Sequence, residues 1–175
     1  MLDMAFLDVS HIDIPFNDGI IHYLVTVPFR QLKRLHIAGI DLNHDAMEAL
    51  STWDSLKTVT FLSLYETKQN SKTLFTLLNS PVVSNLRYLD LDENDATKTM
   101  LKAIARSKYL KNLHILELSD IEVENEDIVH ILKHTNLPNL KYILFEFMDI
   151  SEIQKAHPEF KYELPMDLKV KTHSF

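Results

Sequence analysis

The feature that most constrains the fold of this chain is a repeated spacing of apolar residues, apolar-x-x-apolar-x-apolar. Successive copies begin about 28 residues apart on average, and a fixed period of this kind is typical of repeat architectures. The alternation that ends each copy is typical of a β-strand. The copies are Leu2/Ala5/Leu7 (degenerate), Leu32/Leu35/Ile37, Leu56/Val59/Phe61, Leu86/Leu89/Leu91, Leu113/Leu116/Leu118 and Leu140/Ile143/Phe145.

A stretch with helical periodicity follows each strand-like segment. In Asn125–His134, the apolar residues Ile128, Ile131 and Leu132 fall on one helix face, and acidic residues fill the first turn. The corresponding apolar stripes earlier in the chain are Ala46/Met47/Leu50, Leu74/Leu77/Leu78 and Met100/Leu101/Ile104/Ala105. Each unit therefore predicts a strand, a turn, a helix and a return loop. Because one such unit cannot bury its apolar face alone, we expect the units to stack.

The third complete unit carries the most specific motif. Its segment Leu86–Ala96 reads LxxLxLxxNxA, with Asn94 at the asparagine position. With this motif and its period, the chain resembles the leucine-rich repeat family over roughly residues 2–155, and its helical halves resemble the ribonuclease-inhibitor-like class. The lead-ins Ser80–Leu86 and Ser107–Leu113 resemble those of bacterial members. The resemblance implies an α/β solenoid, a right-handed β-α superhelix with a concave parallel sheet and outer helices, whose concave face is the usual binding surface.

The other units depart from the motif at the asparagine position. There we assign Ser10, Ile40, Leu64, Ile121 and Met148, so apolar packing is expected to replace most of the family's ladder of buried amides. Alternation of strands and helices also fits a doubly wound α/β sheet. The fixed period and the identical spacing within each strand favour the solenoid.

The length of 175 residues predicts one domain. We expect residues 1–175 to form a single repeat domain, with 1–31 as a degenerate N-terminal repeat or cap, 32–150 as the core repeats and 151–175 as a C-terminal cap and tail. Four apolar residues of the last segment are expected to cover the final repeat: Ile153, Phe160, Tyr162 and Leu164. The first strand has no cap before it, and an open strand edge is a template for pairing with another chain.

Strand alternation predicts which side chains lie on the concave face. In the second complete unit it assigns Thr58, Thr60 and Leu62 to that face. Across the last three units, spaced ~4.8 Å apart, it gathers carboxylates beside apolar and aromatic side chains. These residues are the predicted partner-binding patch: Tyr88, Asp90, Asp92, Ile115, Glu117, Tyr142, Leu144 and Glu146. Aromatic anchors among carboxylates suit a basic protein partner. The alternative is that Ile115, Tyr142 and Leu144 are only strand-forming residues.

Composition excludes several classes of function. The formal charge of −7 disfavours nucleic acid and anionic membranes as partners, and two glycines are too few for a phosphate-binding loop or a dinucleotide fingerprint. The absence of cysteine excludes disulfides and thiolate chemistry. No apolar run is long enough to span a membrane and the first residues are not a secretory signal, so we expect a cytoplasmic protein, with a secreted effector as the alternative.

The nine histidines suggest two hypotheses, a metal site and a catalytic site. Asp127, His130 and His134 share one helix face with zinc-compatible spacing, but that face is the polar one, so we expect no metal site. A pair of His36 with Asp90 lacks the serine elbow and oxyanion turn of a hydrolase, so we expect no enzymatic activity and no cofactor.

We predict a module that binds a protein partner, as an inhibitor, an immunity-type protein or an effector. The alternative is a scaffold that pairs through its N-terminal edge, so the chain is expected to be a monomer or an edge-paired homodimer.

Overall fold

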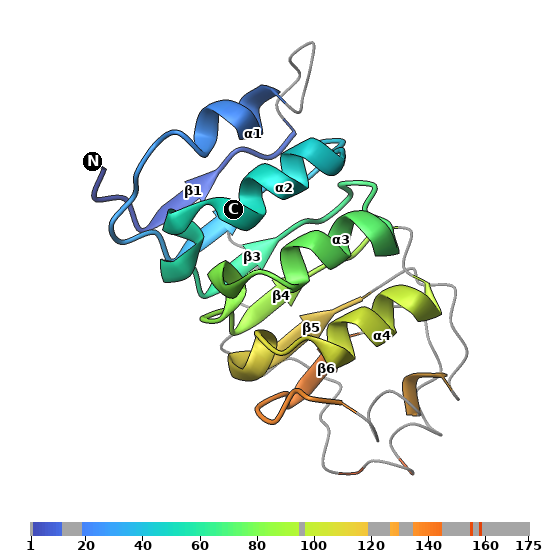
Figure 1. Ribbon diagram of the computed structural model, residues 1–175. Helices are drawn as coiled ribbons and strands as arrows, with labels where there is room; N and C mark the ends of the chain where they lie inside the picture. The colour runs from blue at the N-terminus through green and yellow to red at the C-terminus, as the bar shows by residue number, and fades with distance from the viewer. Residues whose placement is uncertain are drawn as a thin grey trace.

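The computed structural model describes residues 2–11, 19–94, 97–118, 127–129, 135–144, 155 and 158. Its centre is one parallel sheet of six short strands, in which the spatial order of the strands is their order along the chain. The strands are β1 (Phe6–Asp8), β2 (Arg34–His36), β3 (Phe61–Ser63), β4 (Tyr88–Asp90), β5 (Ile115–Glu117) and β6 (Tyr142–Leu144). The protein is thus an α/β fold built on a single parallel sheet (Figure 1).

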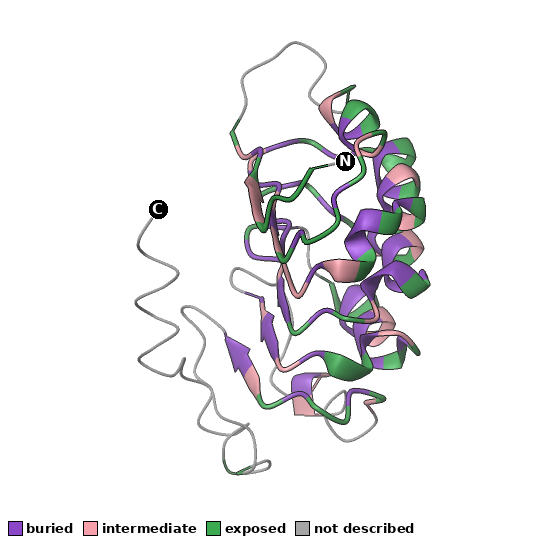
Figure 2. Ribbon diagram, turned by 90° about the vertical axis from the view of Figure 1, so that its left-hand side faces the viewer, coloured by how far each residue is buried: buried purple, intermediate pink, exposed green. Residues whose placement is uncertain are grey.

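In the described part of the chain, α-helices and short 3-10 helices connect the strands. They are α1 (Gly19–Leu24), α2 (His44–Thr52), η1 (Asp54–Thr58), α3 (Ser71–Leu78), η2 (Pro81–Val83), α4 (Lys98–Arg106) and η3 (Leu110–Asn112). Figure 2 shows the described helices on one side of the sheet, with their buried faces turned toward the strands. A doubly wound sheet has helices on both faces, which differs from this arrangement. No helix within the described ranges is long and apolar enough to cross a membrane.

The middle residue of every strand forms one continuous apolar line. Leu7 lies opposite Leu35, which lies opposite Leu62, and the line continues through the later strands. From the second strand on, its members are 27 residues apart: Leu35, Leu62, Leu89, Leu116 and Ile143. These five are buried, as the spacing predicts for Leu35, Leu89, Leu116 and Ile143. We call this side of the sheet the inner face.

The register predicted for two strands is wrong. In the second complete unit, the aligned apolar residues are Val59, Leu62 and Leu64 rather than Leu56, Val59 and Phe61, and Leu56 lies in η1. The three-residue shift is odd, so it exchanges the two faces of the strand, because side chains alternate. Leu62 is therefore buried on the inner face, whereas Phe61 and Ser63 occupy the opposite face.

In the degenerate first copy, Leu2/Ala5/Leu7, the register is shifted by two residues. Leu7, rather than Ala5, lies opposite Leu35. An even shift preserves the assignment of faces, so Phe6 and Asp8 lie opposite the inner face, where alternation along Leu2/Ala5/Leu7 places them.

The predicted helical stripes are confirmed for α2, α3 and α4. All ten of the apolar residues assigned to them are buried: Ala46, Met47, Leu50, Leu74, Leu77, Leu78, Met100, Leu101, Ile104 and Ala105. The helices begin at polar caps, since Asn43 accepts from the Ala46 amide, Asn70 forms a capping box with Thr73, and Thr97 accepts from the Met100 amide. In the last helical stretch Ile128 is buried, and Ile131 and Leu132 lie outside the described residues.

A left-handed turn recurs after the strands. Positive φ angles occur at His11, Gly39, Glu66 and Glu93, again 27 or 28 residues apart. Gly39 has a second reason to be glycine, since a Cβ there would lie 2.1 Å from Nδ1 of His11. Glu66 adopts the same turn with a φ of 52°, a conformation that costs roughly 1–2 kcal/mol for residues with a Cβ.

Asn94 joins the turns of two units, as its motif position implies. Its Oδ1 accepts from the backbone amides of Thr67 (3.2 Å) and Gln69 (2.8 Å), and its Nδ2 donates to the carbonyl of Leu64 (2.7 Å). With the corrected register, the equivalent position one unit earlier is Thr67 rather than Leu64. The Thr67 hydroxyl lies 3.3 Å from Asn94 Oδ1, so a polar pair continues the ladder where we expected apolar packing.

Two further sets of hydrogen bonds link the return loops of neighbouring units. Asn85, Asn112 and Asn139 each donate from Nδ2 to a carbonyl of the preceding unit, at 2.6, 2.8 and 2.7 Å. The hydroxyls of Ser80 and Ser107 donate to the carbonyls of Ser51 and Leu78 in the same way. The serine and asparagine of each lead-in therefore bind one unit to the unit before it.

The two ends of the chain were assigned as caps. In the described part of residues 1–31, β1 pairs with β2 and α1 packs against α2. The four residues predicted to cover the final repeat, Ile153, Phe160, Tyr162 and Leu164, lie outside the described residues.

Candidate functional site

The candidate site is the side of the sheet opposite the helices, which we call the outer face. It carries the first and third residues of each strand. The first residues are Phe6, Arg34, Phe61, Tyr88, Ile115 and Tyr142, and the third residues are Asp8, His36, Ser63, Asp90, Glu117 and Leu144. Because adjacent parallel strands are ~4.8 Å apart, side chains from neighbouring units contact one another across this face.

Aromatic rings stack across the first four strands. His36 contacts the edge of Phe6, with ring centroids 5.3 Å apart, and stacks on Phe61 at 4.7 Å. Phe61 stacks in turn on Tyr88 at 4.5 Å. The guanidinium carbon of Arg34 lies 4.3 Å from the centre of the Phe61 ring, a cation–π contact. These rings form one strip that begins at β1 and ends at β4.

His36 is surrounded by groups that act on its pKa in opposite directions. Burial lowers the pKa of the imidazole, the charge of Asp8 raises it and the charge of Arg34 lowers it, with a net lowering. Burial raises the pKa of Asp8, but hydrogen bonds from Ser10 and the charges of His36 and His11 outweigh it, so that pKa is lowered. At neutral pH His36 is therefore uncharged and Asp8 is ionised.

A small apolar cluster occupies the later strands of the outer face. Tyr88, Ile115 and Leu144 form it, with Phe61 and Tyr142 packed against them. We expected these side chains to face solvent, but Tyr88 is 5% exposed, Ile115 6% and Leu144 8%. They pack against one another, which alternation along a single strand does not reveal. Tyr142 keeps intermediate exposure.

Three carboxylates lie beside this cluster. Asp90, Asp92 and Glu117 each have an oxygen within 4.8 Å of the others, so the structure brings together the acids that the sequence placed on these units. Glu146, the fourth predicted acid, lies outside the described residues. The Tyr88 hydroxyl donates a hydrogen bond to Glu117, and this contact joins the apolar cluster to the acidic one.

Neighbouring donors hold Asp90 in place. Its Oδ2 accepts from the Ser63 hydroxyl at 2.6 Å and its Oδ1 from the Asp92 amide at 3.1 Å. Burial raises the pKa of Asp90, and these two hydrogen bonds oppose the increase without cancelling it. Burial and the charge of Glu117 also raise the pKa of Tyr88, so its hydroxyl stays protonated and remains a donor.

Carboxylate oxygens are ligands for hard cations, and the acidic group could offer one oxygen from each residue. Two oxygens of Asp90 and one of Glu117 already accept hydrogen bonds from the protein. These contacts account for the arrangement without an ion. We therefore interpret these three carboxylates as a concentration of negative charge on a partly apolar surface.

The other candidates of the sequence do not form a site in the described part of the chain. His36 contacts Phe6 and Phe61, and no hydrogen bond joins it to Asp90. Asp127 pairs with Lys98, while His130 and His134 lie outside the described residues. Sequence reasoning missed Phe61 and Ser63 on the outer face. The exact 27-residue spacing of Leu62 from Leu35 and Leu89 is the signal that identifies them.

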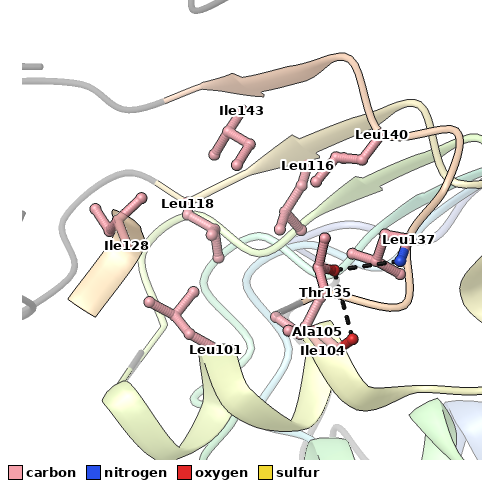
Figure 3. Close-up of a pocket in the computed structure, with 10 residues that line it drawn as sticks. All are labelled: Leu101, Ile104, Ala105, Leu116, Leu118, Ile128, Thr135, Leu137, Leu140 and Ile143. Carbon is pink, nitrogen blue, oxygen red and sulfur yellow. Dashed lines mark hydrogen bonds between the residues drawn. The ribbon is translucent and has the colours of Figure 1, made fainter. Parts of the chain in front are cut away.

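An interior cavity lies between α4 and strands β5 and β6 (Figure 3). Its volume of about 20 Å³ suits no more than one water molecule. Leucine, isoleucine and alanine side chains line it, and Thr135, its polar member, accepts from the Leu137 amide at 3.2 Å and donates to the Ala105 carbonyl at 3.4 Å. The described residues that line this cavity include no group suited to chemistry, so we interpret it as a packing defect of the core.

Comparisons with known proteins do not assign a function to the chain. No protein-family model matches the chain, and no curated protein matches it either.

Proposed function

We propose that this chain is a leucine-rich repeat solenoid of the ribonuclease-inhibitor-like class. The 27-residue register, the sequential strand order and the helices on one side of the sheet support this assignment. Asn94, at the asparagine position of the motif, links the turns of two units, and a left-handed turn recurs with the same period. In this proposal the outer face is the concave face of the solenoid.

We further propose that it is a non-catalytic module that binds a basic protein partner through this outer face. The observation that carries the proposal is the carboxylate group of Asp90, Asp92 and Glu117 on the same face as the half-buried ring of Tyr142, which packs against the adjoining apolar cluster. A lysine or arginine of the partner would pair with the carboxylates while its aliphatic part packs on the ring. Because Tyr88, Ile115 and Leu144 are already buried, their role would be to hold the acids in position rather than to anchor the partner.

This binding mode implies a dependence on pH. Cation binding favours the ionised form of Asp90, whose pKa burial raises. Affinity for a basic partner should therefore increase as pH rises through that pKa. An inhibitory or immunity-type role against a basic toxin, or an effector role, would use such a surface, and we place the protein in the cytoplasm under this proposal.

Affinity capture with two matched variants tests the proposal. One variant carries Asp90→Asn and Glu117→Gln on the outer face, and the control carries Asp45→Asn and Glu48→Gln on the exposed side of α2. Both change the net charge equally. Proteins that the parent and the control retain, and that the outer-face variant loses, would be the expected partners. Equal recovery by all three proteins would rule out the outer face as the binding surface.

A second candidate function is self-assembly through the N-terminal edge. β1 is the edge strand of the sheet, and large apolar side chains near it are exposed: Leu2 by 47%, Met4 by 39% and Tyr23 by 72%. An open strand edge beside apolar side chains favours pairing with a second copy. Light scattering over a concentration series tests this candidate, since the mass should double and a Leu2→Asp/Met4→Asp variant should stay monomeric. A strict monomer at all concentrations would exclude it.

A further inference from the structure

A groove between two helices combines an exposed ring with cations. Helices α3 and α4 pack side by side in the helical layer (Figure 1). The groove between them has a volume of about 270 Å³, and Phe75, Asn79, Thr99, Lys102, Ala103 and Arg106 line it. Within each helix these residues recur at intervals of three or four, which places them along one side of that helix.

The groove has an apolar centre. Phe75 is 55% exposed, whereas most large apolar residues in the described ranges are buried. Its neighbour across the groove is the half-buried Ala103, whose methyl group is too small to cover the ring. Ser71 and Thr97 hydroxyls lie 2.8 Å apart and link the two helices near their first turns. A partner side chain can therefore bury the Phe75 ring without displacing a contact of the protein itself.

The charged residues of the two helices that form the groove are all positive. α3 and α4 together carry Lys72, Lys98, Lys102 and Arg106 and no acid, although the whole chain has a net charge of −7. Lys98 pairs with Asp127. Among the described residues, no carboxylate lies within ion-pair distance of Lys72, Lys102 or Arg106.

The positive region is local. The neighbouring helix α2 carries Asp45 and Glu48 and no lysine or arginine. Lys102 and Arg106 are four residues apart on the groove side of α4, and Lys72 is one turn before Phe75 on α3. Two cations of α4 therefore line the groove that holds the accessible ring, and a third, Lys72, lies one turn from the ring on α3.

We propose that this groove binds an acidic peptide segment that carries one large apolar side chain. The apolar side chain packs on Phe75 and Ala103, and flanking carboxylates pair with Lys102, Arg106 and Lys72. A nine-residue helix such as α4 is about 13 Å long, a length that about four extended residues span. Nucleic acid fits less well, because its affinity depends on neutralising many phosphates and an acidic chain repels it.

Fluorescence anisotropy with three labelled peptides tests the proposal. The peptides are Glu-Glu-Leu-Glu-Glu, the same peptide with serine at its centre, and its charge-reversed form Lys-Lys-Leu-Lys-Lys. We expect the first to bind at least about tenfold more tightly than either of the others, and its affinity to fall as salt rises. No saturation with the first peptide at millimolar protein, or equal binding of the charge-reversed peptide, would overturn the proposal.

Matched variants locate the site. Lys102→Glu should weaken binding about tenfold or more, because it places a like charge beside the peptide, whereas Lys33→Glu, an equal charge change at an exposed lysine outside the groove, should change the affinity less than about twofold. Phe75→Ser should weaken binding, while Tyr23→Ser, at an exposed ring on α1, should not. Circular dichroism confirms that the variants fold. Equal effects of the groove and control variants would overturn the assignment. If a ten-nucleotide single strand binds more tightly than the peptide, the occupant of the groove is nucleic acid and the proposal is wrong. If the protein dimerises with concentration and Lys102→Glu abolishes this, the occupant is a second copy of the chain.

Discussion

The two faces of the same six strands differ in how strictly they repeat. On the inner face, the middle position of every strand is leucine or isoleucine, from Leu7 to Ile143. On the outer face, the neighbouring positions hold aromatic, basic, acidic and aliphatic residues with no period. One short strand, β4, illustrates the difference. Its middle residue, Leu89, follows the repeat, whereas Tyr88 and Asp90 on either side do not.

The difference follows from what each face contacts. In the units whose helices the structure describes, each strand packs against an equivalent helix, so the inner face meets the same space at each step and requires a side chain of the same shape. In the described part of the chain, no such repeated layer covers the outer face. Its residues are therefore free to differ between units.

The largest expected effect comes from the inner face. Leu89→Ala should lower the free energy of unfolding by roughly 2–5 kcal/mol, because Leu89 is fully buried and the cavity cannot collapse between fixed neighbours. Tyr88→Phe, one residue away on the outer face, removes only the hydroxyl that donates to Glu117 and should cost about 1 kcal/mol. Urea denaturation of both variants measures the contrast. A smaller loss for Leu89→Ala than for Tyr88→Phe would contradict the proposed division between the faces.

A second prediction concerns the polar part of the interior. Asn94→Ala should cost about 2–3 kcal/mol, because it leaves the buried amides of Thr67 and Gln69 without a partner and removes one of the two hydrogen bonds to the Leu64 carbonyl. Thr67→Val is the matched control, since it keeps the shape and removes only one hydroxyl; it should cost about 1 kcal/mol. Thermal and urea unfolding measure both. If the two variants lose equal stability, Asn94 is not the centre of this network.

The same contrast explains how much the sequence could predict. The inner face was predictable wherever one spacing fits, and Leu89, Leu116 and Ile143 are buried as expected. In the second complete unit two overlapping spacings fit, Leu56/Val59/Phe61 and Val59/Leu62/Leu64, and only the common 27-residue interval separates them. Local pattern alone cannot choose between them, since both satisfy the apolar rule.

The candidate site was predictable in part. The acids of neighbouring units were placed together correctly, because parallel pairing fixes Asp90 opposite Glu117. The burial of Ile115 and Leu144 was not predictable, since it depends on contacts among side chains of different units. The hydrogen bond from Ser63 to Asp90 was also missed, because it requires the corrected register.

A third prediction tests the electrostatics of the outer face. Because burial raises the folded-state pKa of Asp90, the folded protein binds more protons than the unfolded chain between the two pKa values, and ionisation of Asp90 weakens folding as pH rises through this range. Asp90→Asn should therefore increase stability at neutral pH, by less than about 1 kcal/mol because nearby solvent screens these charges. Urea denaturation at pH 4 and pH 7 should show the gain of the variant growing with pH. A loss of stability at pH 7 would mean that the hydrogen bonds of Asp90 outweigh the cost of its burial.

The smallest effect is expected in the turns that carry the chain from the sheet to the helices. Glu66 is exposed and has a φ of 52°, at the position where the preceding unit has Gly39. Asparagine tolerates this conformation better than glutamate does, so Glu66→Asn should raise the free energy of unfolding by about 0.5 kcal/mol. Glu66→Val is the matched control and should lower it, because a β-branched side chain fits a positive φ worst. If the unfolding curves of both variants equal that of the parent, the backbone conformation of this turn does not limit stability, in contrast to the buried leucines of the inner face.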